Sequence, residues 1–200
     1  MKLLSEKALF LVESKTLVIA DLHFGKINHF RKSGIPVPTK GNKNNSERLV
    51  DLLNRTKPER TIFLGDLFHS HYNEEWEVLG QIIKHFSQCK YELVLGNHDI
   101  LSTIQYSRNN INVVDQLVED NIILTHEPMK QVKTGRYNLS GHLHPGVRLS
   151  GKGRQSMTLP CFYFGSSMGL LPAFGSFTGF KRIEPKKNDR IFVVADKKNS

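Results

Sequence analysis

Short apolar segments of this chain end repeatedly in side chains that can bind metal ions. Polar groups at the ends of neighbouring strands can leave the core and converge on one crevice. The candidates lie in five places, and five of the nine histidines are among them or next to them. The candidate metal ligands are Asp21, His23, Asp66, Asn97, His126, His142 and His144.

The types of these side chains indicate which metals they suit. Imidazole, carboxylate and carboxamide groups favour manganese, iron or zinc, and the absence of cysteine near these positions argues against a structural zinc or iron–sulfur site. Two divalent ions would bring four positive charges, of which Asp21 and Asp66 neutralise two. The remaining positive charge would suit a phosphate ester.

The spacing of two pairs also favours a shared site. In Asp21-x-His23 and His142-x-His144, residues two apart on an extended chain point to the same side and can reach one locus. Glycine precedes three of the candidates, which removes a β-carbon where the backbone must turn beside the ions. Taken singly, each motif also occurs as an ordinary turn or a buried histidine, so the interpretation depends on the whole ordered set.

The elements that must position these residues alternate between strand and helix up to about residue 100 and are mostly β after it. Ser46 is expected to cap one helix, and a second is expected between Trp76 and Phe86. Long loops are expected over Lys32–Asn45 and Gly165–Gly179. The expected strands are Ala8–Val12, Thr16–Ala20, Thr61–Leu64, Glu92–Leu95, Ile122–Thr125, Thr158–Phe164 and Ile191–Ala195. We therefore predict an α/β fold in which residues 1–200 form a single domain of two packed sheets with helices outside.

The composition indicates which binding partners and which cellular location to expect. The net charge of +9 and the pI near 9.6 favour polyanionic partners, although a generally basic proteome explains them equally well. Cys89 and Cys161 form no disulfide framework, and the apolar run near the N-terminus is too short for a signal peptide or a membrane span. We expect a cytoplasmic protein with no membrane association.

The ordered motifs Asp-x-His, Gly-Asp, Gly-Asn-His-Asp, a later His and Gly-His-x-His resemble the calcineurin-like metallophosphoesterase superfamily over Asp21 to His144. The resemblance implies a β-sandwich flanked by helices, with a binuclear metal centre at the strand ends. It also implies which residues share an ion, with Asp66 bridging. One ion would be held by Asp21, His23, Asp66 and His144, and the other by Asp66, Asn97, His126 and His142.

Segments outside these motifs resemble a narrower family, the ligase-associated DNA damage response endonucleases (PdeM). They are Phe24–Lys26, Phe30–Pro38, Gly65–Ser70, Leu159–Phe162 and Leu171–Gly179. This resemblance implies an endonuclease with a role in bacterial DNA repair beside a DNA ligase and a helicase. Our leading hypothesis is a manganese-dependent phosphodiesterase or endonuclease that acts on DNA, with zinc, iron or nickel as alternatives to manganese. The chain departs from the broader superfamily at His69, where a further carboxylate often follows Gly-Asp.

A mechanism follows as a hypothesis. His98 would stabilise or protonate the leaving oxygen, and Asp99 would orient the imidazole of His98. His69 and His71 are candidates for substrate contact or for orienting a ligand. Basic residues near the motifs are candidates for tracking a phosphate backbone, with solvated loops as the equal alternative. They are Arg31, Lys32, Lys130, Lys133, Arg136, Arg148, Lys152 and Arg154.

Two other functions stay open at this point. The chain has no obvious second domain that would bind duplex DNA, so a hydrolase of small phosphodiesters or phosphomonoesters is the first alternative to a DNA phosphodiesterase. A non-catalytic repair scaffold is a more distant alternative, because such a protein would be expected to lose ligands or the counterpart of His98, and here the whole set is present.

Overall fold

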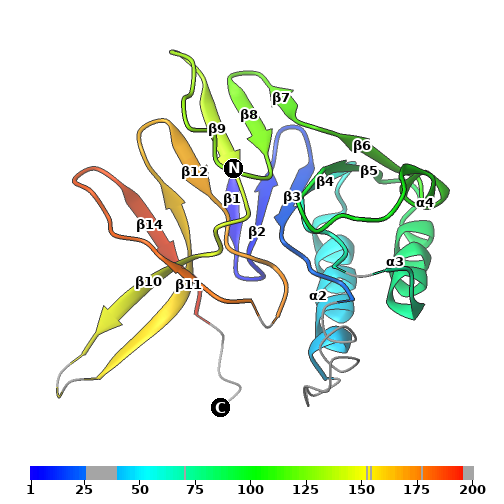
Figure 1. The fold of residues 1–200 in the computed structure, drawn as a ribbon, viewed down its shortest axis with the longest axis horizontal. Helices are drawn as coiled ribbons and strands as arrows, with labels where there is room; N and C mark the ends of the chain where they lie inside the picture. Colours follow the sequence, from blue (N-terminus) through cyan, green and yellow to red (C-terminus); the bar gives the residue numbers. More distant parts are fainter. Residues whose placement is uncertain (26–39, 70, 152, 154, 177, 196–200) are drawn as a thin grey trace.

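The structure is a computed structural model that describes residues 1–25, 40–69, 71–151, 153, 155–176 and 178–195, without the side chains of 40–44. Its strands form two sheets, one of six strands and one of eight, and few helices accompany them (Figure 1). The predicted α/β fold of two packed sheets is confirmed. No described helix is long and apolar enough to cross a membrane.

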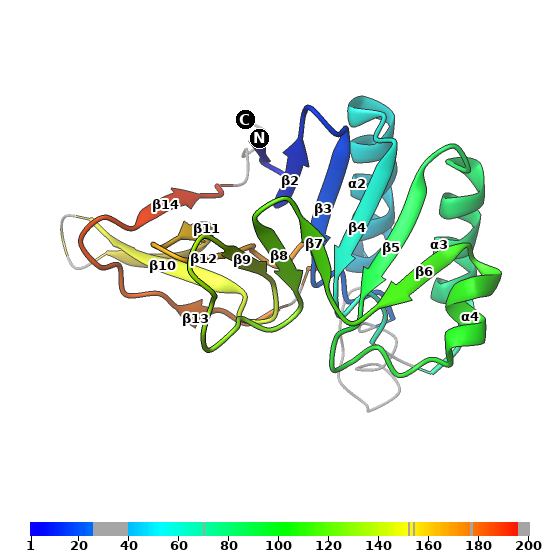
Figure 2. The same ribbon diagram turned by 90° about the horizontal axis from the view of Figure 1, so that it is seen from above.

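The first sheet is formed by the N-terminal half of the chain, with strands in sequence order. An antiparallel hairpin at one edge is followed by four parallel strands, from β3 to β6. The strands are β1 (Lys2–Leu4), β2 (Ala8–Leu11), β3 (Thr16–Ala20), β4 (Arg60–Leu64), β5 (Lys90–Val94) and β6 (Ile111–Val114). The helices between them are α2 (Lys40–Thr56), α3 (Glu74–His85) and α4 (Thr103–Arg108), and they cover one face of this sheet (Figure 2).

The second sheet contains the remaining strands in the order β13-β10-β11-β12-β9-β8-β7, with β14 paired to β11. The strands are β7 (Leu117–Glu119), β8 (Ile122–Thr125), β9 (Tyr137–Ser140), β10 (Pro145–Ser150), β11 (Ser156–Phe164), β12 (Met168–Leu170), β13 (Lys181–Arg182) and β14 (Arg190–Val193). In Figure 2 this sheet lies on the side of the first sheet opposite the helices. Of the described residues, none forms a helix on its outer face, so helices flank the sandwich on one side only.

Two apolar cores hold these layers together. One lies between the helices and the first sheet and includes Trp76 and Phe63; the other lies between the sheets and includes Val18, Leu64 and Phe162. The central strands β3 and β4 are therefore covered on both faces, which explains why their sequences are continuous apolar runs rather than alternating ones.

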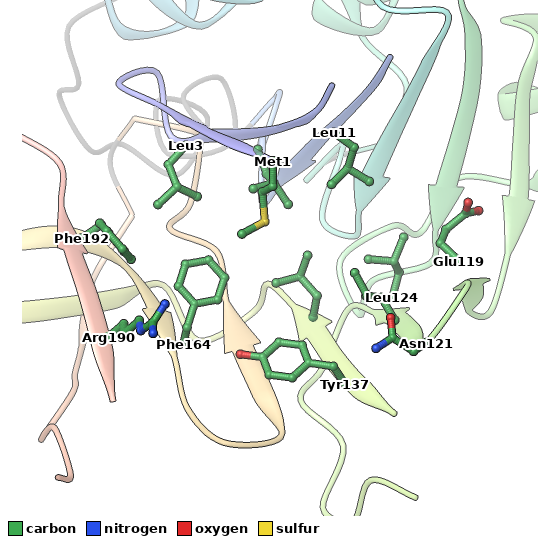
Figure 3. A pocket seen from close by; sticks show the side chains of 13 residues that line it. Met1, Leu3, Leu11, Glu119, Asn121, Leu124, Tyr137, Phe164, Arg190 and Phe192 are labelled. Carbon is green, nitrogen blue, oxygen red and sulfur yellow. The ribbon is translucent and has the colours of Figure 1, made fainter. Parts of the chain in front are cut away.

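At one end of the sandwich the sheets leave an apolar cavity of about 570 Å³. Figure 3 shows side chains of the N-terminal hairpin, such as Leu3 and Leu11, facing Phe164 and Tyr137 of the second sheet across it. Tyr137 and Ile122 begin strands β9 and β8, whose other ends lead to His142 and His126. The cavity and these histidines therefore lie at opposite ends of the strands.

Several local expectations are wrong. Ser46 lies inside α2, so it does not cap that helix, and residues 40–45 of the expected Lys32–Asn45 loop are helical. The expected Gly165–Gly179 loop contains β12, whose three residues pair with β9 and β11. Both elements depend on partners distant in sequence, which local patterns do not reveal.

Candidate metal centre

Four strands, two from each sheet, end at the same place, and the candidate residues follow those ends. Asp21 comes directly after β3 and Asp66 two residues after β4, both in the first sheet. His126 comes directly after β8 and His142 two residues after β9, both in the second sheet. The site is thus assembled across the sandwich.

Three of the candidates form a first group on one side of this site. Potential ligand atoms of Asp21, His23 and His144 all lie within 4.8 Å of one another. The Nε2 atoms of the two histidines are 3.4 Å apart, and Nε2 of His144 is 3.5 Å from Oδ1 of Asp21. The side chain of Asp21 is fully buried and that of His144 is partly open to solvent.

A second group is formed by Asp66, His126 and His142, whose potential ligand atoms also lie within 4.8 Å of one another. Nε2 of His126 lies 3.4 Å from Oδ1 of Asp66 and 3.1 Å from Nδ1 of His142. It also lies 3.0 Å from Oδ1 of Asn97, so the carboxamide faces this group.

The carboxylate of Asp66 stands between the two groups. Its Oδ1 atom faces His126 at 3.4 Å, while its Oδ2 atom faces His23 of the first group at 3.8 Å. One carboxylate can therefore offer one oxygen to each of two adjacent cations.

The hydrogen bonds around His126 fit a cation in the second group. Nδ1 of His126 lies 3.0 Å from the carbonyl oxygen of Leu64, which assigns the proton of the neutral ring to Nδ1. The lone pair on Nε2 then points at the Asn97 and Asp66 oxygens, which are acceptors themselves. Such a convergence of lone pairs is stabilised by a cation, and the residues present fit one in each group.

The backbone at the candidate ligands has an unusual conformation. Asp21, His23, Asp66, His142 and His144 have φ angles of 54°, 49°, 50°, 65° and 46°, in the left-handed region that residues other than glycine rarely adopt. Strained backbone of this kind is concentrated at functional sites. The backbone of these pairs is therefore not extended as expected. Asp21 and His23 still reach one group, whereas His142 and His144 belong to different groups.

Two glycines permit the close approach of neighbouring loops. A β-carbon on Gly65, which has a φ of 72°, would lie 2.2 Å from Nδ1 of His126. One on Gly96 would lie 2.3 Å from the backbone nitrogen of Asp66. No larger residue fits at either position without moving a candidate ligand.

The carboxylate of Asp99 accepts hydrogen bonds from three backbone amides. Its Oδ1 accepts hydrogen bonds from the backbone N–H groups of Leu67 and Phe68, and its Oδ2 accepts one from Gly96. Burial raises the pKa of this carboxyl from 3.8 to about 6. The carboxylate therefore holds together the loops that carry Asp66 and Asn97, and across the described residues no hydrogen bond joins it to the His98 imidazole.

His98 lies beside the first group and next to a further histidine. Its ring centre is 6.0 Å from that of His23 and 4.0 Å from that of His69, and the backbone N–H of His98 donates to Oδ1 of Asp66. His69 therefore belongs to the site, whereas His71 is exposed.

Sequence reasoning missed the contacts that support the Asp21 loop. The backbone N–H groups of Phe174 and Gly175 donate to the carbonyls of Ala20 and Asp21, and the buried Asn45 accepts hydrogen bonds from the amide and hydroxyl of Ser176. The segment expected to be only a loop thus supports a candidate ligand. A buried asparagine in a helix gives no sequence signal for this role.

The basic residues near the motifs are only partly described. Lys130, Lys133, Arg136 and Arg148 are exposed. Arg31, Lys32, Lys152 and Arg154 lie outside the described residues.

Comparison with known proteins identifies a matching family and a similar crystal structure. The profile of the calcineurin-like phosphoesterase family matches residues 14–147, a range that includes every candidate ligand. The crystal structure of the Pseudomonas putida nuclease MPE is similar, with 31% sequence identity and a TM-score of 0.79, and the match covers 96% of this chain and 90% of the other.

Other matches are weaker. The crystal structure of AQ665 from Aquifex aeolicus, a protein of unknown function, is 18% identical with a TM-score of 0.44, over 64% of this chain and 78% of the other. No curated protein sequence matches the chain significantly.

Proposed function

This chain belongs to the calcineurin-like phosphoesterase family, and from that premise we propose that it is a binuclear metal-dependent phosphodiesterase that cleaves DNA. The observation that carries the proposal is the position of the Asp66 carboxylate, which offers one oxygen to each of two groups of histidine and aspartate. Two ions held a few ångströms apart are typical of enzymes that displace an oxygen at phosphorus.

We assign one ion to Asp21, His23, Asp66 and His144 and the other to Asp66, Asn97, His126 and His142. The mixture of imidazole, carboxylate and carboxamide suits manganese, with zinc, iron and nickel as alternatives. When bound, the two ions would supply Lewis acidity to the phosphate oxygens and make a nearby water more acidic. The chain contributes the fixed positions of the ligands, since their backbone and the ring of His126 are held by hydrogen bonds.

His98 is the residue proposed to handle the proton of the leaving group. Water adds to phosphorus as the bond to the leaving oxygen breaks, and that oxygen needs a proton or a hydrogen-bond donor. The His98 backbone is fixed by its bond to Asp66, and its ring lies beside His23. His69, whose ring is in contact with that of His98, would limit the positions the His98 ring can take.

DNA as the substrate is supported by two observations. The similar solved structure is a nuclease, and the match covers 96% of this chain. The net charge of +9 favours a polyanion. We further propose that the enzyme is a ligase-associated endonuclease that works with a DNA ligase and a helicase. We also propose that residues 1–200 act as a single domain. Part of the resemblance behind the finer assignment, residues 30–38, lies outside the described residues.

The test combines metal content with two substrates. The manganese-loaded protein is assayed for nicking of a plasmid and for turnover of bis(4-nitrophenyl) phosphate, with Asp66→Asn as the variant and Asp51→Asn as its control. Asp51 is exposed on α2, so its substitution makes the same chemical change outside the site. We expect Asp66→Asn to lose both bound metal and both activities, and Asp51→Asn to retain them.

Other outcomes decide between the functions. Turnover of the small ester without plasmid nicking would favour a hydrolase of small phosphoesters. No turnover of either substrate with manganese, nickel or zinc would favour a non-catalytic scaffold.

A further inference from the structure

A basic face begins next to the proposed metal ligand His144. Strand β10 starts at Pro145, directly after His144, and β13 pairs with it in parallel. The backbone N–H of Lys181 donates to the carbonyl of His144, and that of Ile183 donates to the carbonyl of Gly146. The short basic strand β13 is therefore attached to the chain as it leaves the metal centre.

The pairing register places two arginines on one face of these strands. Arg182 pairs with Gly146, Arg148 is two residues further along β10, and Arg148 pairs with Thr158 of β11. Paired residues, and residues two apart on a strand, point to the same side of a sheet. We call the side that carries Arg148, Thr158 and Arg182 the β10–β13 face.

This face lies on the same side of the second sheet as the metal centre. Phe162, four residues after Thr158 on β11, belongs to the core between the two sheets. The alternation of a strand puts Thr158 on the same side as Phe162, so the β10–β13 face continues the inner surface of the second sheet beyond the core. The candidate ligands also converge between the two sheets, and Figure 2 shows β10 and β13 side by side.

The arginines of this face have no carboxylate partner within the described residues. Arg148 donates only to the neutral hydroxyl of Ser156, and both arginines are exposed. By contrast, Arg55 pairs with Glu6, and Arg60 pairs with Glu92 and Glu119. Strands β10, β11 and β13 contain no aspartate or glutamate. The positive charge of this face is therefore available to an external anion.

An aromatic side chain, that of Phe180, also lies on the β10–β13 face. A β-carbon on Gly146 would lie 2.8 Å from Cβ of Phe180, so Phe180 covers the strand at the position that pairs with Arg182. The side chain of Phe180 is still 46% exposed. An aromatic surface beside arginines can pack against the sugars or bases of a nucleic acid while the arginines contact its phosphates.

We infer that the β10–β13 face binds the phosphate backbone of the nucleic acid on one side of the cleaved bond, with Arg182 and Arg148 each contacting a phosphate; this rests on the proposed function. Arg148 lies four residues after His144, which is about 13 Å along a strand. That distance corresponds to roughly four nucleotides at the rise of a B-form strand. The face thus recognises polymers and does not contact a small phosphodiester at the metal centre.

The experiment uses a double variant that carries both Arg148→Ala and Arg182→Ala. Its control is the single variant Arg108→Ala. Arg108 is exposed on α4, which Figures 1 and 2 both place on the far side of the molecule from β10. Binding of a fluorescent oligonucleotide is followed by anisotropy over a range of salt concentrations, in EDTA to prevent cleavage. We expect the double variant to bind more weakly and the slope of log K against log salt to decrease in magnitude by about 0.7 to 0.9 for each arginine removed.

A second measurement separates this inference from the proposed function. With manganese, the double variant should hydrolyse bis(4-nitrophenyl) phosphate like the wild type and show a raised KM only for oligonucleotides that reach beyond the metal centre. Unchanged oligonucleotide binding in the double variant, or an equal loss in Arg108→Ala, would overturn the role of this face even if the enzyme is active. A wild-type protein inactive on both substrates would instead overturn the proposed function.

Discussion

The Nδ1 atom of His126 lies 3.0 Å from the carbonyl oxygen of Leu64, so a candidate ligand of the second sheet is oriented by the backbone of the first. This contact requires that Gly65, the residue after Leu64, has no side chain, because a β-carbon there would lie 2.2 Å from the same nitrogen. The packing of the two sheets and the geometry of the site are thereby coupled.

Replacing Gly65 by alanine tests this coupling. We expect a loss of stability of about 2 to 5 kcal/mol, from the positive φ and the overlap with His126 together, and a loss of metal from the second group. The control is Gly135→Ala, because Gly135 has a φ of 79° and nothing within 4 Å of its would-be β-carbon. That control should lose only about 1 to 2 kcal/mol and keep its metal. Urea unfolding and metal analysis measure both effects, and equal metal content in the two variants would contradict the coupling.

Replacing His98 by glutamine should lower kcat while leaving metal content unchanged, because His98 lies beside the first group and belongs to neither. A lost proton donor typically costs about 100-fold or more in rate. His85→Gln, at the exposed end of α3, is the matched control and should keep full activity. If His98→Gln loses bound metal, His98 is a ligand or a support for one, and its proposed catalytic role is wrong.

Asp99→Asn should mainly reduce stability. The carboxylate accepts three backbone hydrogen bonds, and an amide would direct its NH₂ group at one of those N–H donors. We expect a loss of about 2 to 3 kcal/mol in urea unfolding of the metal-free protein. The exposed Asp115 provides the control Asp115→Asn, which should unfold like the wild type. An unchanged stability combined with reduced turnover would return Asp99 to the role of orienting His98.

The contact between Glu6 and Arg55 predicts a dependence of stability on pH. The hydrogen bond from Arg55 lowers the pKa of Glu6 from 4.5 to about 2. A lowered pKa in the folded state stabilises the protein above the unfolded value, and the contribution disappears as the pH falls from 4.5 toward 2. Because Arg55 is half exposed, we expect Glu6→Gln to cost only about 0.5 kcal/mol at neutral pH. Urea midpoints should converge with those of the wild type as the pH falls, while the exposed Glu13→Gln should match the wild type throughout.

The strands that lead into the site could be predicted because their signal is local. Thr16–Ala20 and Ile122–Thr125 are apolar and β-branched, and both predictions agree with the bounds of β3 and β8. The short polar strand β13 and the start of α2 before Ser46 were not predicted, since neither has a local pattern and β13 exists only through its pairing with β10.

The sequence by itself determined which chemical groups are available, in what order they occur and that strands deliver them, because residue type and hydrophobic pattern are properties of the chain. The family resemblance implied that His144 joins Asp21 and His23 while His142 joins Asp66 and His126, but only the tertiary structure brings the ligand atoms of each group within 4.8 Å of one another. It also decided the left-handed backbone at Asp21 and Asp66, and the use of Asp99 by backbone amides. These features arise from contacts between residues far apart in the sequence, such as Asp21 and His144, and such contacts form only when the two sheets pack together.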